Sequence, residues 1–172
     1  MAHLVLAILL LVVSVSPAAA QAPTGFTEFP WGTAPSVLRE EFVARRCKRT
    51  TESALSWFSI QCHDYAVERL SVPLLRLDFE PASSLAGYSM VVARASYPAL
   101  RDLVMQRFGR PTSRTAIPFA GQQMWWTWPG VSATLIERCE DGTSCLEVST
   151  AALDVRRAQI RDRQRRESMQ SF

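Results

Sequence analysis

Four cysteines behind an apolar leader place the strongest constraint on how this chain folds. Residues 4–13, LVLAILLLVV, are uniformly apolar, and the SVSPAAA that follows ends in the small residues of an A-x-A cleavage site. The run is shorter than the roughly 20 apolar residues that span a bilayer. We therefore expect a signal peptide over residues 1–20, cleaved near Ala20, and a periplasmic or secreted mature chain. An uncleaved anchor is the alternative, because no Lys or Arg precedes the run.

The cysteines all lie in the exported part, and an even number in an oxidising compartment implies disulfides. Cys139 and Cys145 flank EDGTS between two strand-like runs, so a hairpin would bring them together. Cys47 ends a helix-like stretch, and Cys62 ends the next strand-like run. We predict the pairs Cys47–Cys62 and Cys139–Cys145. Zinc binding is disfavoured, because no close cysteine pair occurs and His63 is the one histidine of the mature chain.

The net charge of +3 is unevenly distributed. Residues 21–154 carry 13 Lys and Arg against 14 Asp and Glu, whereas residues 155–172 carry six Arg against Asp162 and Glu167. The body has no basic excess of the kind that binds nucleic acid. We interpret the tail as a solvated helix, with weak electrostatic contact to an anionic envelope surface as the alternative.

Apolar periodicity predicts two amphipathic helices, PSVLREEFVARRC at 35–47 and SYPALRDLVMQRFGRP at 96–111. GFTEFPWGT at 25–33 is interpreted as a short strand or extended arm. Alternation predicts strands at 57–62, 72–80, 88–95, 124–128, 132–139 and 145–150. TTES and residues 112–121 are interpreted as connections. The last segment is predicted to be a helix whose thin stripe, Leu153, Val155 and Ile160, docks only the first turns.

These elements predict an α+β fold in one domain over residues 21–153, followed by an Arg-rich helix or tail over residues 154–172. We expect an antiparallel sheet of about six strands with two amphipathic helices on one face. The order of elements also suggests tandem helix-plus-three-strand units.

Three of the five tryptophans lie in MWWTW, residues 124–128. Period-two alternation assigns Met124, Trp126 and Trp128 to the core and leaves Trp125 on the open face. Large aromatic side chains at a partly exposed patch are typical interface anchors. Trp57 and Trp125 are therefore the candidate partner contacts. The alternative is that Trp125 packs against the C-terminal helix.

The sequence predicts no catalytic, cofactor-binding or metal-binding residues, and we expect the protein not to be an enzyme. Neither a G-x-S-x-G elbow nor a phosphate-binding or dinucleotide-binding motif is present. His63 beside Asp64 is interpreted as a surface pair. Asp78, Glu80, Glu137 and Glu147 lie on predicted strands, so a pair of neighbouring carboxylates stays open as an alternative.

Taken together, GFTEFPWGTAPSVL, LLRLDF, LVMQRFGRPTS and MWWTW resemble a group of small exported bacterial proteins of uncharacterised function, over roughly residues 25–153. That resemblance implies a periplasmic or secreted α+β module. By architecture alone, the chain is similar to the β-lactamase inhibitory protein and to assembly lipoproteins of the SmpA type, which use an open sheet or an adjoining surface to hold protein partners.

We therefore expect an exported, disulfide-stabilised binding or adaptor module that acts through contact with a protein partner and does not bind nucleic acid. A proteinaceous inhibitor of a hydrolase is one alternative. An envelope enzyme of an unrecognised type is the other.

Overall fold

The structure is a computed structural model that describes residues 21–27, 29–37, 47–51, 57–81, 84–119, 121–140 and 142–170. The predicted signal peptide and residues 38–46 of the predicted first helix lie outside these ranges. Residues 35–37 are helical, as predicted for the start of that helix. Within the described ranges, no helix is both long and apolar enough to cross a membrane.

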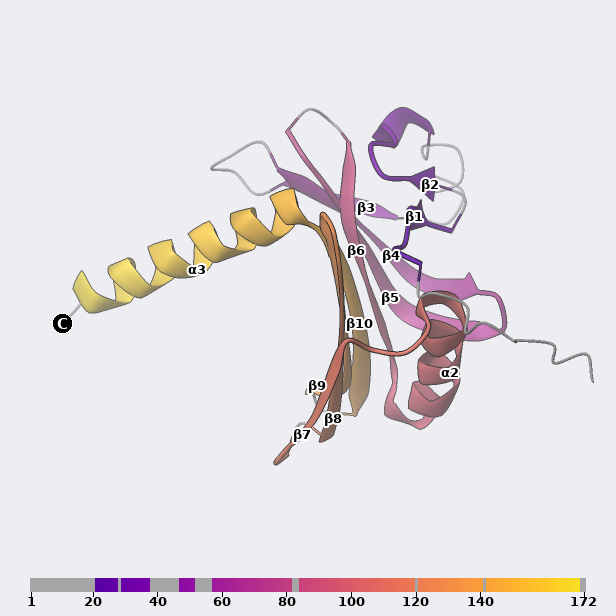
Figure 1. Ribbon diagram of the computed structural model, residues 1–172. Coiled ribbons are helices and arrows are strands. Elements are labelled where there is room, and N and C mark those ends of the chain that lie inside the picture. The colour runs from indigo at the N-terminus through magenta and orange to yellow at the C-terminus, as the bar shows by residue number, and fades with distance from the viewer. Residues whose placement is uncertain are drawn as a thin grey trace, which may run out of the picture.

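Strands make up most of the fold (Figure 1). A small hairpin is formed by β1 (Gly25–Phe26) and β2 (Phe29–Pro30). The main sheet contains β3 (Lys48–Thr51), β4 (Phe58–Val67), β5 (Leu70–Phe79), β6 (Leu85–Ala93), β7 (Ser113–Ile117), β8 (Gly121–Trp128), β9 (Val131–Glu140) and β10 (Thr143–Thr150). The helices are η1 (Arg94–Ser96), α2 (Tyr97–Phe108) and α3 (Ala151–Gln170).

The main sheet consists of two antiparallel meanders whose last strands meet at its centre. Its order is β3-β4-β5-β6-β10-β9-β8-β7. The first meander runs from the β3 edge to β6. The chain then crosses through η1 and α2 to the opposite edge, and the second meander returns from β7 to β10. β6 and β10 pair from Gly87↔Ser149 to Ala93↔Thr143, so this one ladder joins the two halves.

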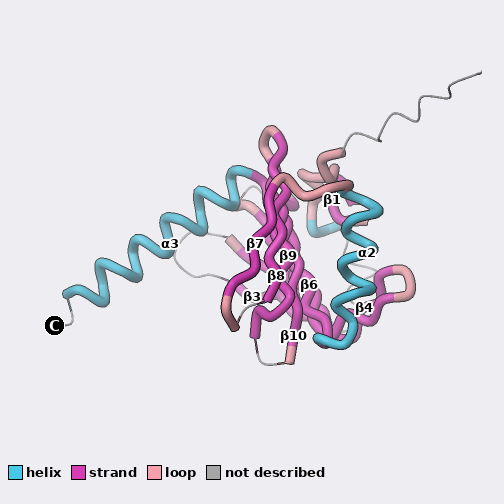
Figure 2. The backbone as a smooth tube through the Cα atoms, turned by 60° about the horizontal axis from the view of Figure 1, so that its bottom comes forward, coloured by secondary structure: helices cyan, strands magenta, loops and turns pink. Residues whose placement is uncertain are grey.

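The predicted balanced α+β fold is wrong. The protein is mostly β, with eight strands in the main sheet rather than about six, and each meander has four strands rather than three. The two helices that the structure describes in full, α2 and α3, lie on opposite faces of the sheet rather than on one (Figure 2). The predicted boundary at residue 154 falls inside α3.

The two strands that the sequence did not predict, β3 and β7, are the two edges of the sheet. Alternation arises when one face of a strand is buried. All five residues of β7 are exposed, so selection for apolar residues at every second position is absent there. An edge strand therefore has the composition of a loop, and only its place in the tertiary structure makes it a strand.

The core lies on the face that α2 covers, called here the α2 face. In α2, Tyr97, Leu100, Val104 and Phe108 are buried, a helical spacing that faces the sheet. The ring of Phe108 meets Trp126 edge-on at 6.0 Å, and the Trp126 indole N–H donates to the carbonyl of Gly109 at 3.1 Å. Gly109 ends the helix with φ +72, a conformation that favours glycine.

The β1–β2 hairpin packs on another part of the α2 face, around Tyr65 and Tyr88. Phe26 is buried, and its ring contacts those of Tyr65 at 6.1 Å and Tyr88 at 4.9 Å. Trp31 stacks on Tyr88, and its indole N–H donates to the carbonyl of Pro23 at 2.7 Å. Burial raises the pKa of Tyr88 above its usual range, and the positive charge of Arg107 offsets part of that shift. The predicted extended arm is therefore a structural part of the core.

Candidate partner-binding surfaces

The residues of β8 alternate between the two faces of the sheet, as the sequence predicts. Met124 and Trp126 are buried on the α2 face, where Trp126 is only 1% exposed. Trp128 is half-buried on the same face and meets the Phe108 ring edge-on at 5.6 Å. Trp125 points to the other face, called here the α3 face, and is half-buried.

Trp125 lies close to the β7 edge of the sheet. Its register partners are Thr134 in β9 and Ser113 in β7, so only the edge strand separates it from solvent on that side. The residues that follow it across the α3 face are mostly polar, and they include Thr134, Glu147 and Ser89.

Trp57 lies just before β4, in the other half of the sheet. It helps to line a cavity of about 30 Å³ together with Arg156 and Ile160 of α3. Five strand-to-strand steps separate β4 from β8, which is about 24 Å at roughly 4.8 Å per step. The structure therefore places Trp57 beside the C-terminal helix and does not bring the two predicted contact residues together.

The first turns of α3 are held on the sheet by a polar cluster. The carboxylate of Asp154 accepts hydrogen bonds from the hydroxyls of Ser132 at 2.9 Å and Ser149 at 2.6 Å. Leu153 packs directly above Gly87, where a β-carbon would collide with the leucine side chain. Glycine at this position therefore permits the close approach of helix and sheet.

A second set of contacts involves the buried carboxylate of Asp78, which is 3% exposed. Arg76 donates to it at 2.7 Å from the same strand, and Arg157 of α3 approaches it at 3.5 Å. Arg157 also bonds Glu147 at 3.2 Å. A buried carboxylate with two cationic partners is electrostatically satisfied, so Asp78 is a docking residue for α3 in this arrangement.

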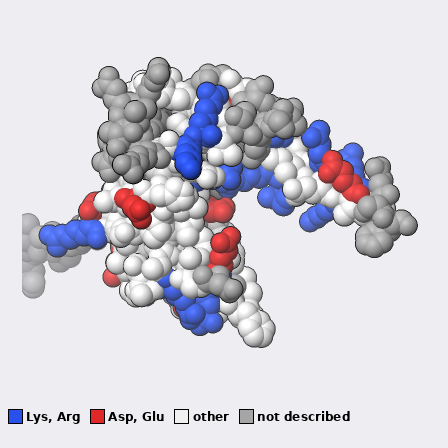
Figure 3. Space-filling model, turned by 180° about the vertical axis from the view of Figure 1, so that it is seen from behind, with Lys and Arg blue, Asp and Glu red and all other residues white. Residues whose placement is uncertain are grey.

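The remainder of α3 projects away from the body of the protein (Figure 1). Residues 161–169 are all exposed, and arginine side chains gather along this arm with few acidic ones among them (Figure 3). The prediction that only the first turns dock is confirmed. The apolar stripe predicted for this helix is partly wrong, because Leu153 is buried against the sheet whereas Val155 is 58% exposed.

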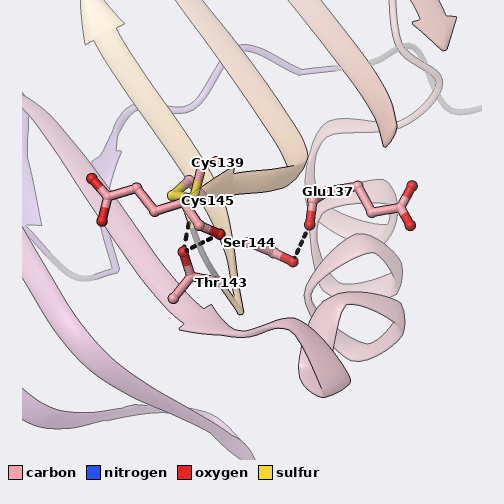
Figure 4. The surroundings of a disulfide bond; sticks show 6 residues. Glu137, Cys139, Thr143, Ser144 and Cys145 are labelled. Atoms are coloured by element: carbon pink, nitrogen blue, oxygen red, sulfur yellow. Dashed lines mark hydrogen bonds between the residues drawn. A yellow bond between two sulfur atoms is a disulfide. The ribbon is translucent and has the colours of Figure 1, made fainter. Parts of the chain in front are cut away.

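Both predicted disulfides are present. Cys47–Cys62 ties the residue before β3 to β4, and Cys139–Cys145 lies within the β9–β10 hairpin. The Thr143 hydroxyl lies 3.3 Å from the Cys139 sulfur and donates to the carbonyl of Glu140 (Figure 4). The second crosslink therefore fixes a hairpin at the end of the sheet remote from α3.

The β7–β8 hairpin, beside this crosslink, presents the most exposed aromatic side chain among the described residues. Phe119 is 95% exposed and has a φ of +69, which is uncommon for a residue with a side chain. Ile117, two residues before it, is 38% exposed. Backbone strain of this kind persists where the surrounding structure enforces it, and it is often associated with function.

A hollow of about 490 Å³ opens beside Phe119. Two arginines, Arg94 and Arg138, contribute positive charge to its wall, and Glu140 contributes one negative charge. The remaining lining residues are Pro118, Phe119, Cys139 and Gly142. Its wall thus combines an aromatic ring with guanidinium groups that can pair with carboxylates.

The carboxylates on the strands are engaged by other groups of the protein, and Asp78 and Glu147 share Arg157. Glu137 accepts a hydrogen bond from the backbone N–H of Gln122 at 2.8 Å, whereas Asp78 and Glu147 bind arginines. His63 and Asp64 are both exposed. Among the described residues, no group of three or more His, Cys, Asp or Glu side chains is arranged to hold a metal ion.

Ile117 and Phe119 lie within residues 112–121, which the sequence predicts as a connection, so neither is a predicted site residue. One signal was available. Ile117-Pro118-Phe119 places two large apolar side chains around a proline in a segment with no apolar alternation. Such a triplet in an apparent connection is a signal, readable from the sequence, for large apolar side chains outside the regular alternation of the strands.

Comparison with protein-family models, with curated proteins and with solved structures found no match to this chain.

Proposed function

We propose that this chain is an exported binding module that docks a protein partner through the β7–β8 hairpin surface, defined as residues 113–119 together with Trp125. The two disulfides fit an oxidising compartment outside the cytoplasm. The single observation that carries the docking surface is Phe119, an aromatic ring 95% exposed at the margin of a 490 Å³ hollow.

Exposed aromatic residues beside a concavity are the usual anchors of protein interfaces, because they bury a large apolar area at a low cost in side-chain entropy. Trp125 belongs to the same surface, since its register partner Ser113 lies in β7. Trp57 contributes less to this proposal, because α3 residues share its cavity.

Photo-crosslinking tests the proposal directly. A benzophenone amino acid replaces Phe119 in one variant and Val155 in the control, which is 58% exposed on α3. We expect a discrete crosslinked product from position 119 and not from position 155 in the envelope or medium of producing cells. The captured protein is then purified, and its affinity for the mature chain is measured by calorimetry.

With that partner, Phe119→Ala should weaken binding by at least about tenfold, as for an anchor residue worth roughly 1.4 kcal/mol or more. Trp125→Ala should weaken it less, because that side chain is half-buried. Equal crosslinking from both positions, or an unchanged affinity for Phe119→Ala, would show that the hairpin is not the docking surface.

A second candidate function, association with an anionic envelope surface, is favoured by the projecting arm of α3. Residues 161–169 are exposed and carry Arg161, Arg163, Arg165 and Arg166 against Asp162 and Glu167. Each arginine near an anionic membrane contributes roughly 1 kcal/mol, and salt screens the attraction.

Vesicle sedimentation tests this second proposal. Binding to phosphatidylglycerol vesicles should fall when the four arginines are changed to glutamine, and it should rise when Asp162 and Glu167 are changed to asparagine and glutamine. Equal binding of all variants, or equal binding to phosphatidylcholine vesicles, would remove this function.

A further inference from the structure

The outer edge of β7 is an uncovered row of backbone hydrogen-bonding groups. β7 ends the sheet, and all five of its residues are exposed. Among the residues that the structure describes, no strand pairs with its far side, and the two backbone views show none beside it (Figures 1 and 2). Such an edge is a template for a further strand unless charge, proline or a covering element protects it.

Hydrogen bonds around β8 identify which residues of β7 direct their backbone groups outward. In β8, the carbonyl of Trp125 accepts from Thr112 and the N–H of Thr127 donates to the Thr112 hydroxyl, so the odd residues of β8 face β7. The N–H of Gln122 donates instead to Glu137 of β9, so the even residues face away from β7.

The register then assigns the outward groups of β7. Arg114 pairs with Met124 and Ala116 pairs with Gln122, which are both even residues. In an antiparallel ladder such pairs are the non-hydrogen-bonded ones, and their backbone groups point away from each other. Arg114 and Ala116 therefore direct two N–H and two C=O groups to solvent along the outer edge.

The charge along this side of the sheet favours one kind of occupant. From Leu103 to Ile136 the sequence contains Arg107, Arg110 and Arg114 and no Asp or Glu. Arg107 is paired with Glu68 at 2.6 Å, whereas Arg110 and Arg114 are exposed. Beyond the end of β7, the wall of the hollow contains Arg94, Arg138 and one acidic residue, Glu140. An acidic segment laid along this edge would therefore meet Arg110 and Arg114 at one end and a hollow of net positive charge at the other.

A second copy of the chain fits less well. Antiparallel self-pairing centred on Thr115 would place Arg114 opposite Ala116 of the second copy and leave the two Arg114 side chains as diagonal neighbours on one face. Like charges at that separation oppose pairing. An extended acidic segment has no such conflict.

We propose that the edge of β7 accepts an extended acidic segment of a partner protein as an additional strand, through the outward backbone groups of Arg114 and Ala116. This inference rests on the proposed docking function and names the chemistry of the partner. Main-chain bonds supply the affinity, and an acidic side chain opposite Arg114 supplies the preference.

The experiment uses the mature protein labelled with ¹⁵N and a short peptide that alternates threonine and glutamate. We expect the peptide to slow amide hydrogen exchange at Arg114 and Ala116 by about tenfold or more at millimolar concentration, while the amides of the central strands β6 and β10 stay unchanged. A threonine–lysine peptide and an N-methylated threonine–glutamate peptide should protect neither amide.

Ala116→Pro is the sharpest variant, because it removes an outward N–H without removing a bond to β8. It should abolish peptide binding, whereas Ala116→Val should retain it. Arg114→Glu should reverse the preference between the glutamate and lysine peptides. Far-ultraviolet circular dichroism and thermal unfolding verify that each variant folds.

Several results would overturn the inference: no protection by the glutamate peptide, wild-type binding by folded Ala116→Pro, or concentration-dependent self-association that Ala116→Pro removes. The two proposals fail separately. A partner that depends on Phe119 but ignores Ala116→Pro would leave the docking function standing and exclude strand addition. Peptide binding at the β7 edge without any Phe119-dependent partner would support strand addition and exclude the proposed docking function.

Discussion

The two faces of the sheet are built from the same strands but have opposite physical character. The α2 face is an apolar layer, in which Trp126 is covered by Phe108 of α2 and Tyr88 by Phe26 of the β1–β2 hairpin. The α3 face is largely polar, and α3 is held there by carboxylates, hydroxyls and arginines near one end of the strands. Apolar burial on the α2 face therefore supplies most of the stability of the fold. The α3 face and the β7 edge provide the surface that is available for contacts with other molecules.

The adjacent residues Trp126 and Trp125 give the strongest test of this difference. Trp126→Ala should lower the free energy of unfolding by about 3–5 kcal/mol, because it leaves a cavity in a closed core. Trp125→Ala should cost about 1 kcal/mol or less. Urea denaturation of the two variants measures both values. Equal losses would mean that the α3 face is as much a core as the α2 face.

Asp154 tests how firmly α3 is attached. Asp154→Ala should cost about 1–3 kcal/mol, because Ser149 is buried and would lose a charged hydrogen-bond partner. Amide exchange in the first turns of α3 should accelerate in this variant. The matched control is Asp162→Ala on the projecting arm, which should change stability by no more than about 0.5 kcal/mol. A large effect of the control would show that the arm is also packed.

Tyr97 tests the apolar character of the α2 face. Its hydroxyl is buried without a hydrogen-bond partner, so Tyr97→Phe should be neutral or should stabilise by up to about 1 kcal/mol. Burial, assisted by the negative charge of Glu137, raises the pKa of Tyr97 above 10.0. The unfolded chain therefore loses its proton first, and stability falls as the pH rises above about 10.

Tyr97→Phe removes the ionisable hydroxyl, so the decline of the free energy of unfolding between about pH 9 and pH 11 should become shallower. Tyr88, whose pKa is also raised by burial, should still contribute to that decline. Chemical denaturation across that range measures the slope. A slope as steep as that of the wild type would indicate that the Tyr97 hydroxyl ionises as freely in the folded protein as in the unfolded chain.

The smallest effect on stability is expected at Phe119. Because its ring is almost fully exposed, Phe119→Ala should change the free energy of unfolding by no more than about 0.5 kcal/mol. Thermal unfolding at neutral pH provides the measurement. A loss of several kcal/mol would mean that the ring is packed against the body of the protein, and the docking proposal would lose its main support.

Features that arise from local spacing were predictable. The apolar periodicity of residues 96–111 is a property of neighbouring residues, and the helix that it predicts is present as α2, Tyr97–Phe108. The disulfide pairs followed from cysteines placed at the ends of local elements. The assignment of Trp125 and Trp126 to opposite faces required only the pleat of a strand.

Features that depend on tertiary position were not predictable. Nothing local distinguishes SRTAI from a loop, because an edge strand needs no buried face. The hairpin between β4 and β5 passes through Glu68 with φ +55, a turn that lacks the usual glycine. The exposure of Phe119 likewise depends on which strand ends the sheet, and that order is set by pairings between residues far apart in the sequence.

The central pairing of β6 with β10 has a consequence for the timing of folding. β6 ends at Ala93, but β10, its partner on the side away from β5, begins at Thr143. Nearly the whole second meander must therefore be available before the β6–β10 ladder can form. A chain that emerges from its N-terminus can complete only the first meander early, and it holds β6 as an open edge in the meantime. Such long-range pairing slows folding and extends the interval in which the edge is vulnerable to aggregation. This interval, more than the final stability of the sheet, should determine how much the protein depends on chaperones while it folds.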